Sequence, residues 1–330
     1  MLCWGTWPIF LKMAKRYRFE LFYFDFGFGM GFVALLCALT AGSLGFDGFN
    51  FSDDIMNARK QEWLLAILAA MIFNFGNMLT LAASSITGIA VAFPLAFGVA
   101  MIIGSWMNYL GHAGINATLM WGGTLLVILS LLLGSSAYSH LKALQHETMA
   151  RAGKTKSTRR PSPLKGILLA LVGGLVLGTF GPLLLRAQDP EDGVGPYSLL
   201  FLFALGVVVS TFIFNLFFMN LPVEGDPVEI TDYIRTPIKN HMFGALSGAM
   251  WGIGAVAAFV ANTPKGDVHP TGPASLLLPQ AAPILAALWG WLIWKEFKAG
   301  DIRVKAFAGL MLVFFAGGLT LFSLAAMTAK

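Results

Sequence analysis

The chain has 330 residues, of which 57% are hydrophobic and only 12% are charged. A soluble domain carries about 25% charged residues, so this composition excludes an ordinary soluble protein. It fits a bilayer, where spanning segments satisfy their own backbone groups as helices. The net charge of +5 does not indicate nucleic-acid binding, because the basic residues lie in short segments between apolar runs.

Residues that form disulfides or bind metals are few. Cys3 and Cys37 are the two cysteines, and the five histidines are scattered along the chain. Two thiols make no disulfide framework, and neither residue type has the spacing of a metal site. The sequence also shows no nucleophile beside a matching base. We therefore expect no metal, no cofactor and no enzyme activity.

A membrane-spanning helix needs roughly 20 mostly apolar residues. Nine runs meet this requirement, and they lie at 21–45, 62–84, 86–110, 115–138, 164–185, 196–220, 241–262, 272–294 and 304–327. A tenth apolar run, at 1–14, is shorter. Its charged residues follow the apolar stretch, whereas those of a signal peptide precede it. The predicted fold class is an all-α polytopic membrane protein of ten transmembrane helices, the first of them truncated.

The basic residues are divided unevenly between the two sides. With the run at 1–14 as span one, the loops after odd-numbered spans hold 17 of the 22 Lys and Arg residues. Basic residues accumulate in cytoplasmic loops, so these loops are predicted to be cytoplasmic. Both termini are then outside or periplasmic, and the protein is placed in the plasma (inner) membrane.

A short motif occurs twice in the chain. Residues 5–12 read GTWPIFLK, and residues 178–186 read GTFGPLLLR. We therefore predict two five-helix repeats, 1–140 and 164–330, joined by a basic cytoplasmic connector at 141–163. Because five is an odd number, the two repeats insert in opposite directions, as in many secondary transporters.

The two copies of the motif differ in what precedes them. Span six has a long apolar stretch before its copy, at 164–177, whereas span one has only residues 1–4. From this difference we expect the natural protein to begin about 10 to 15 residues further upstream, which would make span one long enough to cross the bilayer.

Several motifs match a known family. They are GTWP at 5–8, Asp25, Gly76-Asn77, Asn108-Tyr109, Asn215, Gln280, Pro283, Trp289-Gly290 and Glu296. On these residues the chain resembles the ureide permeases, which are similar to the bacterial glucose/ribose porters of the drug/metabolite transporter superfamily. The resemblance covers nearly the whole chain and implies a transporter, without specifying its substrate.

The chain departs from the plant ureide permeases at two points. Those proteins are described with a Walker A-like element in the central loop, but here Gly153-Lys154-Thr155 has Thr148 in place of the first glycine, and no strand precedes it. We therefore predict no phosphate site there. Phe93 and Leu277 align with acidic residues of spans four and nine, which leaves the substrate and the coupling open.

Prolines occur at related places in both predicted repeats. They are Pro8, Pro94, Pro182, Pro279 and Pro283. A proline inside a helix removes a backbone hydrogen bond, and in lipid such a break persists where neighbours or a cavity satisfy the freed group. We interpret these positions as helix breaks beside a solute site at the repeat interface. The alternative is a packing kink.

Polar and aromatic side chains within the spans are the candidate solute ligands. Amides both donate and accept hydrogen bonds, and polar groups in spans usually face the protein interior. Tryptophans can stack on a flat heterocycle or a sugar ring. The candidates are Thr6, Trp7, Asn74, Asn77, Thr179, Asn215, Trp251 and Gln280. The alternatives are interhelical hydrogen bonding for the amides and interfacial anchoring for Trp7.

Asp25 is the carboxylate that lies clearly inside a predicted span, so it is the candidate for proton coupling. The alternative is an interfacial carboxylate paired with Arg16 or Arg18. Glu296 is predicted to pack against the loop before span ten as a structural element.

The sequence thus predicts a secondary active transporter that imports a small neutral polar solute by alternating access and proton symport. The solute is a ureide- or nucleobase-type heterocycle or a monosaccharide. Two alternatives stay open, namely an exporter of a metabolite or amino acid and a non-transporting membrane scaffold or sensor. The expected partners are the solute, protons and the lipid bilayer, with no nucleic acid. An oligomeric state is not indicated.

Overall fold

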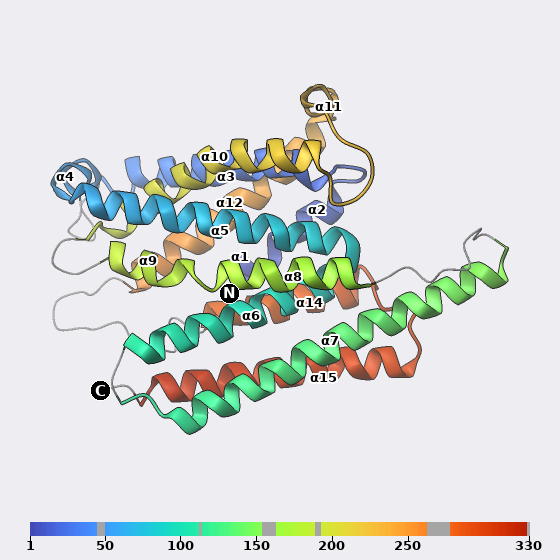
Figure 1. The fold of residues 1–330 in the computed structure, drawn as a ribbon. Helices are drawn as coiled ribbons and strands as arrows, with labels where there is room; N and C mark the ends of the chain where they lie inside the picture. Colours follow the sequence, from blue (N-terminus) through green and yellow to red (C-terminus); the bar gives the residue numbers. More distant parts are fainter. Residues whose placement is uncertain (45–49, 112–113, 154–162, 189–192, 263–277, 329–330) are drawn as a thin grey trace. The chain divides into compact units, whose positions relative to one another are not determined.

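A computed structural model describes residues 1–330 except 45–49, 112–113, 154–162, 189–192, 263–277 and 329–330. The described residues form helices and contain no strand (Figure 1). Eight helical segments are long and apolar enough to cross a membrane. They are α3 (Phe19–Leu39), α5 (Lys60–Thr87), α6 (Ile89–Gly111), α7 (Ala117–Arg151), α8 (Leu164–Leu177) with α9 (Phe180–Ala187), α10 (Pro196–Asn220), α12 (Ile238–Asn262) and α15 (Ile302–Ala326).

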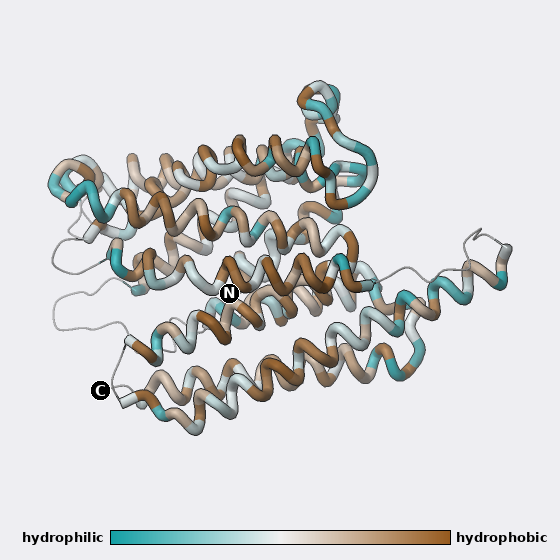
Figure 2. Tube along the Cα trace, in the orientation of Figure 1, coloured by the Kyte–Doolittle hydropathy of each residue, from teal (hydrophilic) through white to brown (hydrophobic). Residues whose placement is uncertain are grey.

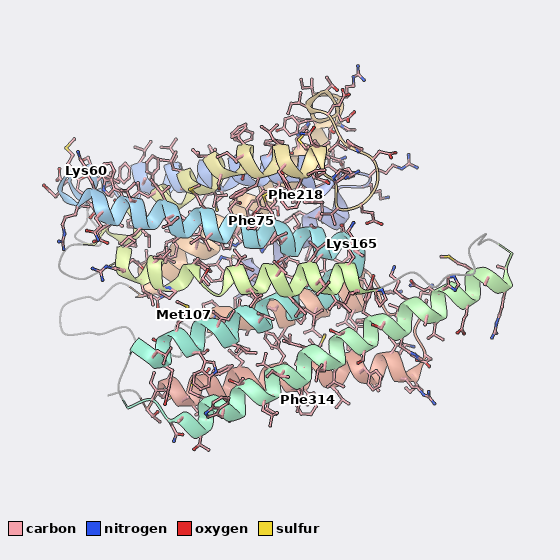
Figure 3. All side chains as sticks on the ribbon, in the orientation of Figure 1. Lys60, Phe75, Met107, Lys165, Phe218 and Phe314 are labelled. Carbon is pink, nitrogen blue, oxygen red and sulfur yellow. The ribbon has the colours of Figure 1, made fainter. Side chains whose placement is uncertain are left out.

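Each of these eight segments coincides with one of the nine predicted apolar runs. Figure 2 shows apolar residues along the helices and hydrophilic residues at helix ends and in loops. Lys60 and Lys165 lie in the first turns of α5 and α8, whereas Phe75 and Phe314 lie within their spans (Figure 3). Charged groups are costly inside a bilayer, so this distribution confirms the all-helical class and an integral membrane protein.

The remaining helices are short. They are α1 (Leu2–Thr6), α2 (Ile9–Met13), α4 (Phe51–Asn57), α11 (Ile230–Arg235), the 3₁₀ turn η1 (Leu278–Ala281), α14 (Ala282–Leu288) and the π-helical turn η2 (Trp289–Ile293). The last three make up the described part of predicted span nine, a short apolar segment at Pro279–Ile293. Gly272 and Leu277 of that span lie outside the described residues. The total of ten spanning helices remains a prediction.

The chain packs as two compact units, each combining segments that are distant in sequence. The first unit contains residues 1–78 and 179–282, and the second contains 79–178 and 283–330. Each unit therefore draws helices from both predicted repeats.

In the first unit, α12 packs directly on α3 because small residues line their contact. Gly244, Gly248 and Gly252 recur every fourth residue and so share one face of α12. A Cβ atom on Gly244 or Gly248 would collide with Asp25 or with the carbonyl oxygen of Phe26. Stripes of small residues allow membrane helices to approach closely. This close packing holds α12 beside the start of α3.

In the second unit, α7 and α15 pack along one another (Figure 1). A Cβ atom on Gly318 of α15 would meet Val127 of α7, and the Ser130 hydroxyl donates to the carbonyl oxygen of Met311 at 2.8 Å. A second close contact joins α6 to α8, where Gly174 lies against the carbonyl group of Ala96. Small residues therefore set helix contacts in this unit also.

Both copies of the repeated motif interrupt their helices. Span one is broken at Trp7-Pro8, between α1 and α2, and span six at Gly178-Thr179, between α8 and α9. Pro182 follows the second break and lies in the first turn of α9, where the missing N–H group costs little. These two spans are discontinuous, as the sequence predicts.

The predicted break at Pro94 is wrong. α6 continues through this residue, which is its sixth position and is buried. A proline fixes φ near −65°, which a helix accepts, and it removes one hydrogen bond near the start of α6. The lost bond does not end the helix. In predicted span nine, Pro279 lies in the 3₁₀ turn and Pro283 in the first turn of α14.

The junction between α5 and α6 depends on Gly88 and Glu296. Gly88 has a φ of +88°, a conformation that suits glycine. A Cβ atom there would also meet the Glu296 carboxylate. The two carboxylate oxygens accept hydrogen bonds from the backbone N–H groups of Ile89 (3.1 Å) and Ala90 (2.8 Å). Glu296 therefore caps the N-terminus of α6, which corrects the predicted packing against the loop before span ten.

Replacing Glu296 by alanine is expected to fray the start of α6. The change leaves two backbone N–H groups without their acceptor, which costs roughly 1–2 kcal/mol of stability. Faster hydrogen exchange at Ile89 and Ala90 and a lower melting temperature in detergent would show this effect. Glu224→Ala, on an exposed loop residue, is the control and should leave both measurements unchanged.

Candidate functional site

Buried amides of α5 and α10 form one group of candidate residues in the first unit. Asn74 is fully buried, and its Nδ2 donates to the hydroxyls of Ser210 (2.8 Å) and Thr211 (3.1 Å) on α10. Asn77 lies one turn further along α5, and its Nδ2 donates to the Tyr23 hydroxyl at 2.9 Å. The interhelical hydrogen bonds predicted as the alternative are therefore present for both amide nitrogens.

The oxygen atoms of the same amides have no such partners. Oδ1 of Asn74 and Oδ1 of Asn77 are buried without a hydrogen bond. Asn215, on α10, is fully buried and lacks a partner on both amide atoms, and Oε1 of Gln280 is likewise buried and unpaired. A buried polar atom without a partner costs roughly 1–3 kcal/mol. These side chains are suited to a ligand or to water.

The predicted aromatic ligands lie among protein rings. Trp7 is 1% exposed and packs on Phe26 with a centroid distance of 5.0 Å. Trp251 stacks on Phe203 at 5.5 Å and on Trp4 at 5.6 Å. Both tryptophans are thus core residues of the first unit in this conformation.

The predicted threonines occupy the two helix breaks. Thr6 ends α1 and is half-buried, whereas Thr179 precedes α9 and is exposed. Their predicted contact with solute remains untested.

Asp25 is at the centre of a second polar group, close to the start of α3. The residue is 5% exposed. Its Oδ2 accepts a hydrogen bond from the Tyr17 hydroxyl and its Oδ1 accepts one from the Tyr233 hydroxyl, each at 2.6 Å. Nδ1 of His241, on α12, lies 3.0 Å from both carboxylate oxygens. We call Tyr17, Asp25, Tyr233 and His241 the Asp25 cluster.

The predicted alternative, in which Asp25 pairs with Arg16 or Arg18, does not describe this arrangement. Arg18 instead contacts Glu20, with Nη2 to Oε1 at 2.6 Å, and donates to the carbonyl oxygen of Asp226. The nitrogen that the structure places beside the Asp25 carboxylate is Nδ1 of His241, 3.0 Å from Oδ2.

The two tyrosines act as hydrogen-bond donors to Asp25. Burial, and then the hydrogen bond to Asp25, raise the pKa of Tyr17 above its usual range. The same causes raise the pKa of Tyr233. Both phenols therefore keep their protons at physiological pH, and each offers one O–H group to the carboxylate.

Sequence reasoning missed these three residues because Tyr17 and Tyr233 lie outside the predicted spans and His241 is only the first residue of the run at 241–262. One signal was available, namely that His241 stands one turn before Gly244, the first glycine of the α12 stripe that contacts α3. Metal binding was rejected from the sequence. Within the part of the chain that the structure describes, no group of three or more His, Cys, Asp or Glu side chains is placed to hold a metal ion.

The described residues form long apolar helices, two of which are interrupted, and they enclose buried uncharged polar groups. These features together are typical of a membrane transporter. Residues 1–323 match the family described as "Sugar transport protein". The chain belongs to this family. It is a transporter and not an enzyme.

Curated relatives extend over most of the chain. "Ureide permease 1" of Arabidopsis thaliana is 21% identical and covers 96% of this chain and 92% of its own length. "Putative ribose uptake protein RbsU" of Staphylococcus aureus (strain COL) is 24% identical over 78% of each chain. A solved crystal structure aligns with 99% of this chain and 94% of its own, with a TM-score of 0.50 and 16% identity, and this likeness shows the fold alone. The family resemblance expected from the motifs is confirmed.

Proposed function

We propose that the protein imports a small, neutral, polar solute across the plasma (inner) membrane by alternating access, in symport with protons. The observation that carries this proposal is the set of unpaired buried amide atoms on Asn74, Asn77 and Asn215 in the first unit. Buried polar atoms are nearly always hydrogen-bonded in native proteins, so these atoms favour a ligand that satisfies them. Amides are uncharged and pair with donors and acceptors alike, which suits a neutral solute.

The names of the relatives narrow the class of solute. One group is named for ureides and the other for ribose. Ureides and sugars are both neutral and rich in hydrogen-bonding groups, and an amide can pair with either. We therefore propose a ureide- or nucleobase-type heterocycle or a monosaccharide as the solute.

Contacts within the first unit support two inverted repeats. Gly29 of α3 packs against Ala245 of α12, and Gly206 of α10 packs against Ile67 of α5. The two glycines are 177 residues apart, and their two partners are 178 residues apart. The same helix contact therefore occurs twice at a nearly constant spacing, which favours repeats 1–140 and 164–330 joined by the 141–163 connector.

The short helices add a second pair of equivalent contacts. α4 follows α3 and contacts α10, whereas α11 follows α10 and contacts α3. If α3 corresponds to α10, then α4 corresponds to α11, and the two contacts are one contact repeated with the partners exchanged. Inverted repeats related by a pseudo-two-fold axis have this property.

The charge distribution supports the orientation. With 17 of the 22 Lys and Arg residues in loops after odd-numbered spans, these loops are placed in the cytoplasm and both termini outside. The Asp25 cluster then lies near the cytoplasmic end of α3. We assign proton coupling to Asp25, because a buried carboxylate that can gain and lose a proton links solute movement to the proton gradient.

Uptake into proteoliposomes tests the proposed function. Purified protein should accumulate one of the labelled solutes allantoin, uracil, xanthine, ribose or glucose when the exterior is more acidic than the interior. Efflux of a preloaded solute without any uptake would favour an exporter. Failure to move every solute tested would favour a scaffold or sensor and contradict the proposal.

Asn215→Leu tests the solute site itself. The Asn215 side chain makes no hydrogen bond to the protein, and leucine has the same number and branching of side-chain heavy atoms, so the variant should leave the melting temperature in detergent unchanged or raised. The KM for uptake should rise about tenfold, since one lost hydrogen bond is worth about 0.5–1.5 kcal/mol and 1.4 kcal/mol is tenfold. Asn220→Leu, at an exposed asparagine of the same helix, is the control. An unchanged KM in the Asn215 variant would remove this residue from the site.

A further inference from the structure

We infer that His241 is a second proton-carrying residue of the coupling site, present as an imidazolium paired with the Asp25 carboxylate, an inference that rests on the proton symport proposed above. Both ring nitrogens of His241 lie within hydrogen-bond distance of protein oxygens. Nδ1 lies 3.0 Å from both oxygens of Asp25, and Nε2 lies 3.1 Å from the backbone carbonyl oxygen of Tyr233.

The hydrogen-bond partners of His241 determine how many protons it carries. A carbonyl oxygen is an acceptor only, so Nε2 must carry a proton to bond with Tyr233. A neutral imidazole would then present the lone pair of Nδ1 to the two carboxylate oxygens, which also only accept. The Tyr17 hydroxyl lies 3.2 Å from Nδ1, but it donates its proton to Oδ2 of Asp25 at 2.6 Å and so presents an oxygen to Nδ1. The contact at Nδ1 is then attractive with one further proton between His241 and Asp25. Which of the two residues carries this proton follows from the hydrogen-bond partners of each.

The neighbours of Asp25 favour placing that proton on His241. Tyr17 donates to Oδ2 and Tyr233 to Oδ1, each at 2.6 Å, and hydrogen bonds of this kind stabilise an ionised carboxylate. The nearby charged residues Arg18 and Glu20 are engaged with each other. Uncharged residues of α10 lie against this part of α3, namely Phe212 beside Phe24, and Val208 and Thr211 beside Gly27. The imidazolium is therefore the cation that balances Asp25.

The pair also connects the proton to helix α11. Tyr233 binds Asp25 through its hydroxyl and His241 through its carbonyl oxygen, so one residue of this short helix contacts both members of the pair. Loss of the shared proton would leave the Nδ1 lone pair against the carboxylate and make the arrangement repulsive. Release of the proton is thereby linked to displacement of α11 from α3.

Nitrogen NMR of the full chain, labelled with ¹⁵N-histidine and held in detergent, tests the charge state without any transport. At pH 7.5 His241, assigned by its absence in His241→Gln, should show two protonated ring nitrogens. In Asp25→Asn it should show one, because the charged partner is gone. A wild-type His241 with a single protonated nitrogen at this pH would overturn the inference.

Transport measurements test the role of the same residue. His241→Gln should lower proton-driven accumulation about tenfold or more while solute exchange at equal pH continues, which also shows that the variant is folded. His140→Gln is the matched control, because His140 pairs with Asp301 on an exposed surface at 3.2 Å. Wild-type accumulation by His241→Gln would overturn the inference alone. Wild-type protein that transports without any response to the proton gradient would instead overturn the proposed symport.

Discussion

We expect Asp25→Asn to abolish proton-driven accumulation and to leave solute binding in place. Asparagine has nearly the same shape as aspartate, and its Oδ1 still accepts a hydrogen bond from Tyr17 or Tyr233, but it cannot gain and lose a proton. The solute should therefore only equilibrate across the membrane, and its internal concentration should not exceed the external concentration. The measurement is uptake into proteoliposomes with and without a proton gradient, together with solute binding in detergent.

A half-buried aspartate of the first unit provides the control for Asp25. Asp54 of α4 accepts hydrogen bonds from the backbone N–H group of Gly195 at 3.1 and 2.9 Å, and burial raises the pKa of its carboxyl. Asp54→Asn makes the same chemical change away from the Asp25 cluster and should keep accumulation. If Asp25→Asn accumulates solute as well as Asp54→Asn does, Asp25 has no part in coupling.

Gly248→Ala is the substitution with the largest expected effect on stability. Its new Cβ atom would overlap the carbonyl oxygen of Phe26, a backbone atom that cannot turn away as a side chain can. Overpacking of this kind costs about 3 kcal/mol, and α12 would have to move away from α3. We expect a strongly lowered melting temperature in detergent and a loss of folded protein during size-exclusion chromatography.

A glycine-to-alanine substitution at Gly181 should have the opposite effect on the melting temperature. A Cβ atom at this position of α9 meets no atom within 4 Å, and glycine within a helix is roughly 0.5–1 kcal/mol less favourable than alanine. Gly181→Ala should therefore melt at the same temperature or slightly higher. Equal melting temperatures for the two variants would show that α12 and α3 are not in the contact described here.

The spanning helices were predictable because each depends on a local property of the sequence. The run at 196–220 and helix α10 have the same bounds, and Pro8 and Pro182 predicted interruptions in the two spans that carry the repeated motif. Pro94 was misjudged because a proline near the start of a helix removes only one hydrogen bond, and the sequence alone does not show where that helix begins.

The residues of the candidate site were harder to predict from the sequence than the helices were. Asp25 was recognised from its position inside an apolar run, but Tyr233 and His241 lie 208 and 216 residues further along the chain. Nothing local links them to Asp25. The close approach of α3 and α12 brings these residues together, and it depends on glycines whose role appears only once the facing residues are known. Likewise, the oxygens of Asn74 and Asn77 could be identified as unpaired only from a structure that gives the neighbours of each atom.

Helix α7 has a practical consequence for imaging. It is unbroken over 35 residues, which at 1.5 Å per residue is about 52 Å, while the hydrocarbon core of a bilayer is about 30 Å thick. We expect its last turns, toward Arg151, to project into water as a stiff rod. A fusion partner whose own first helix continues from Arg151 would then be held rigidly. For a 35.5 kDa chain, such a fiducial mark would supply the mass and asymmetry that particle alignment in electron cryomicroscopy requires.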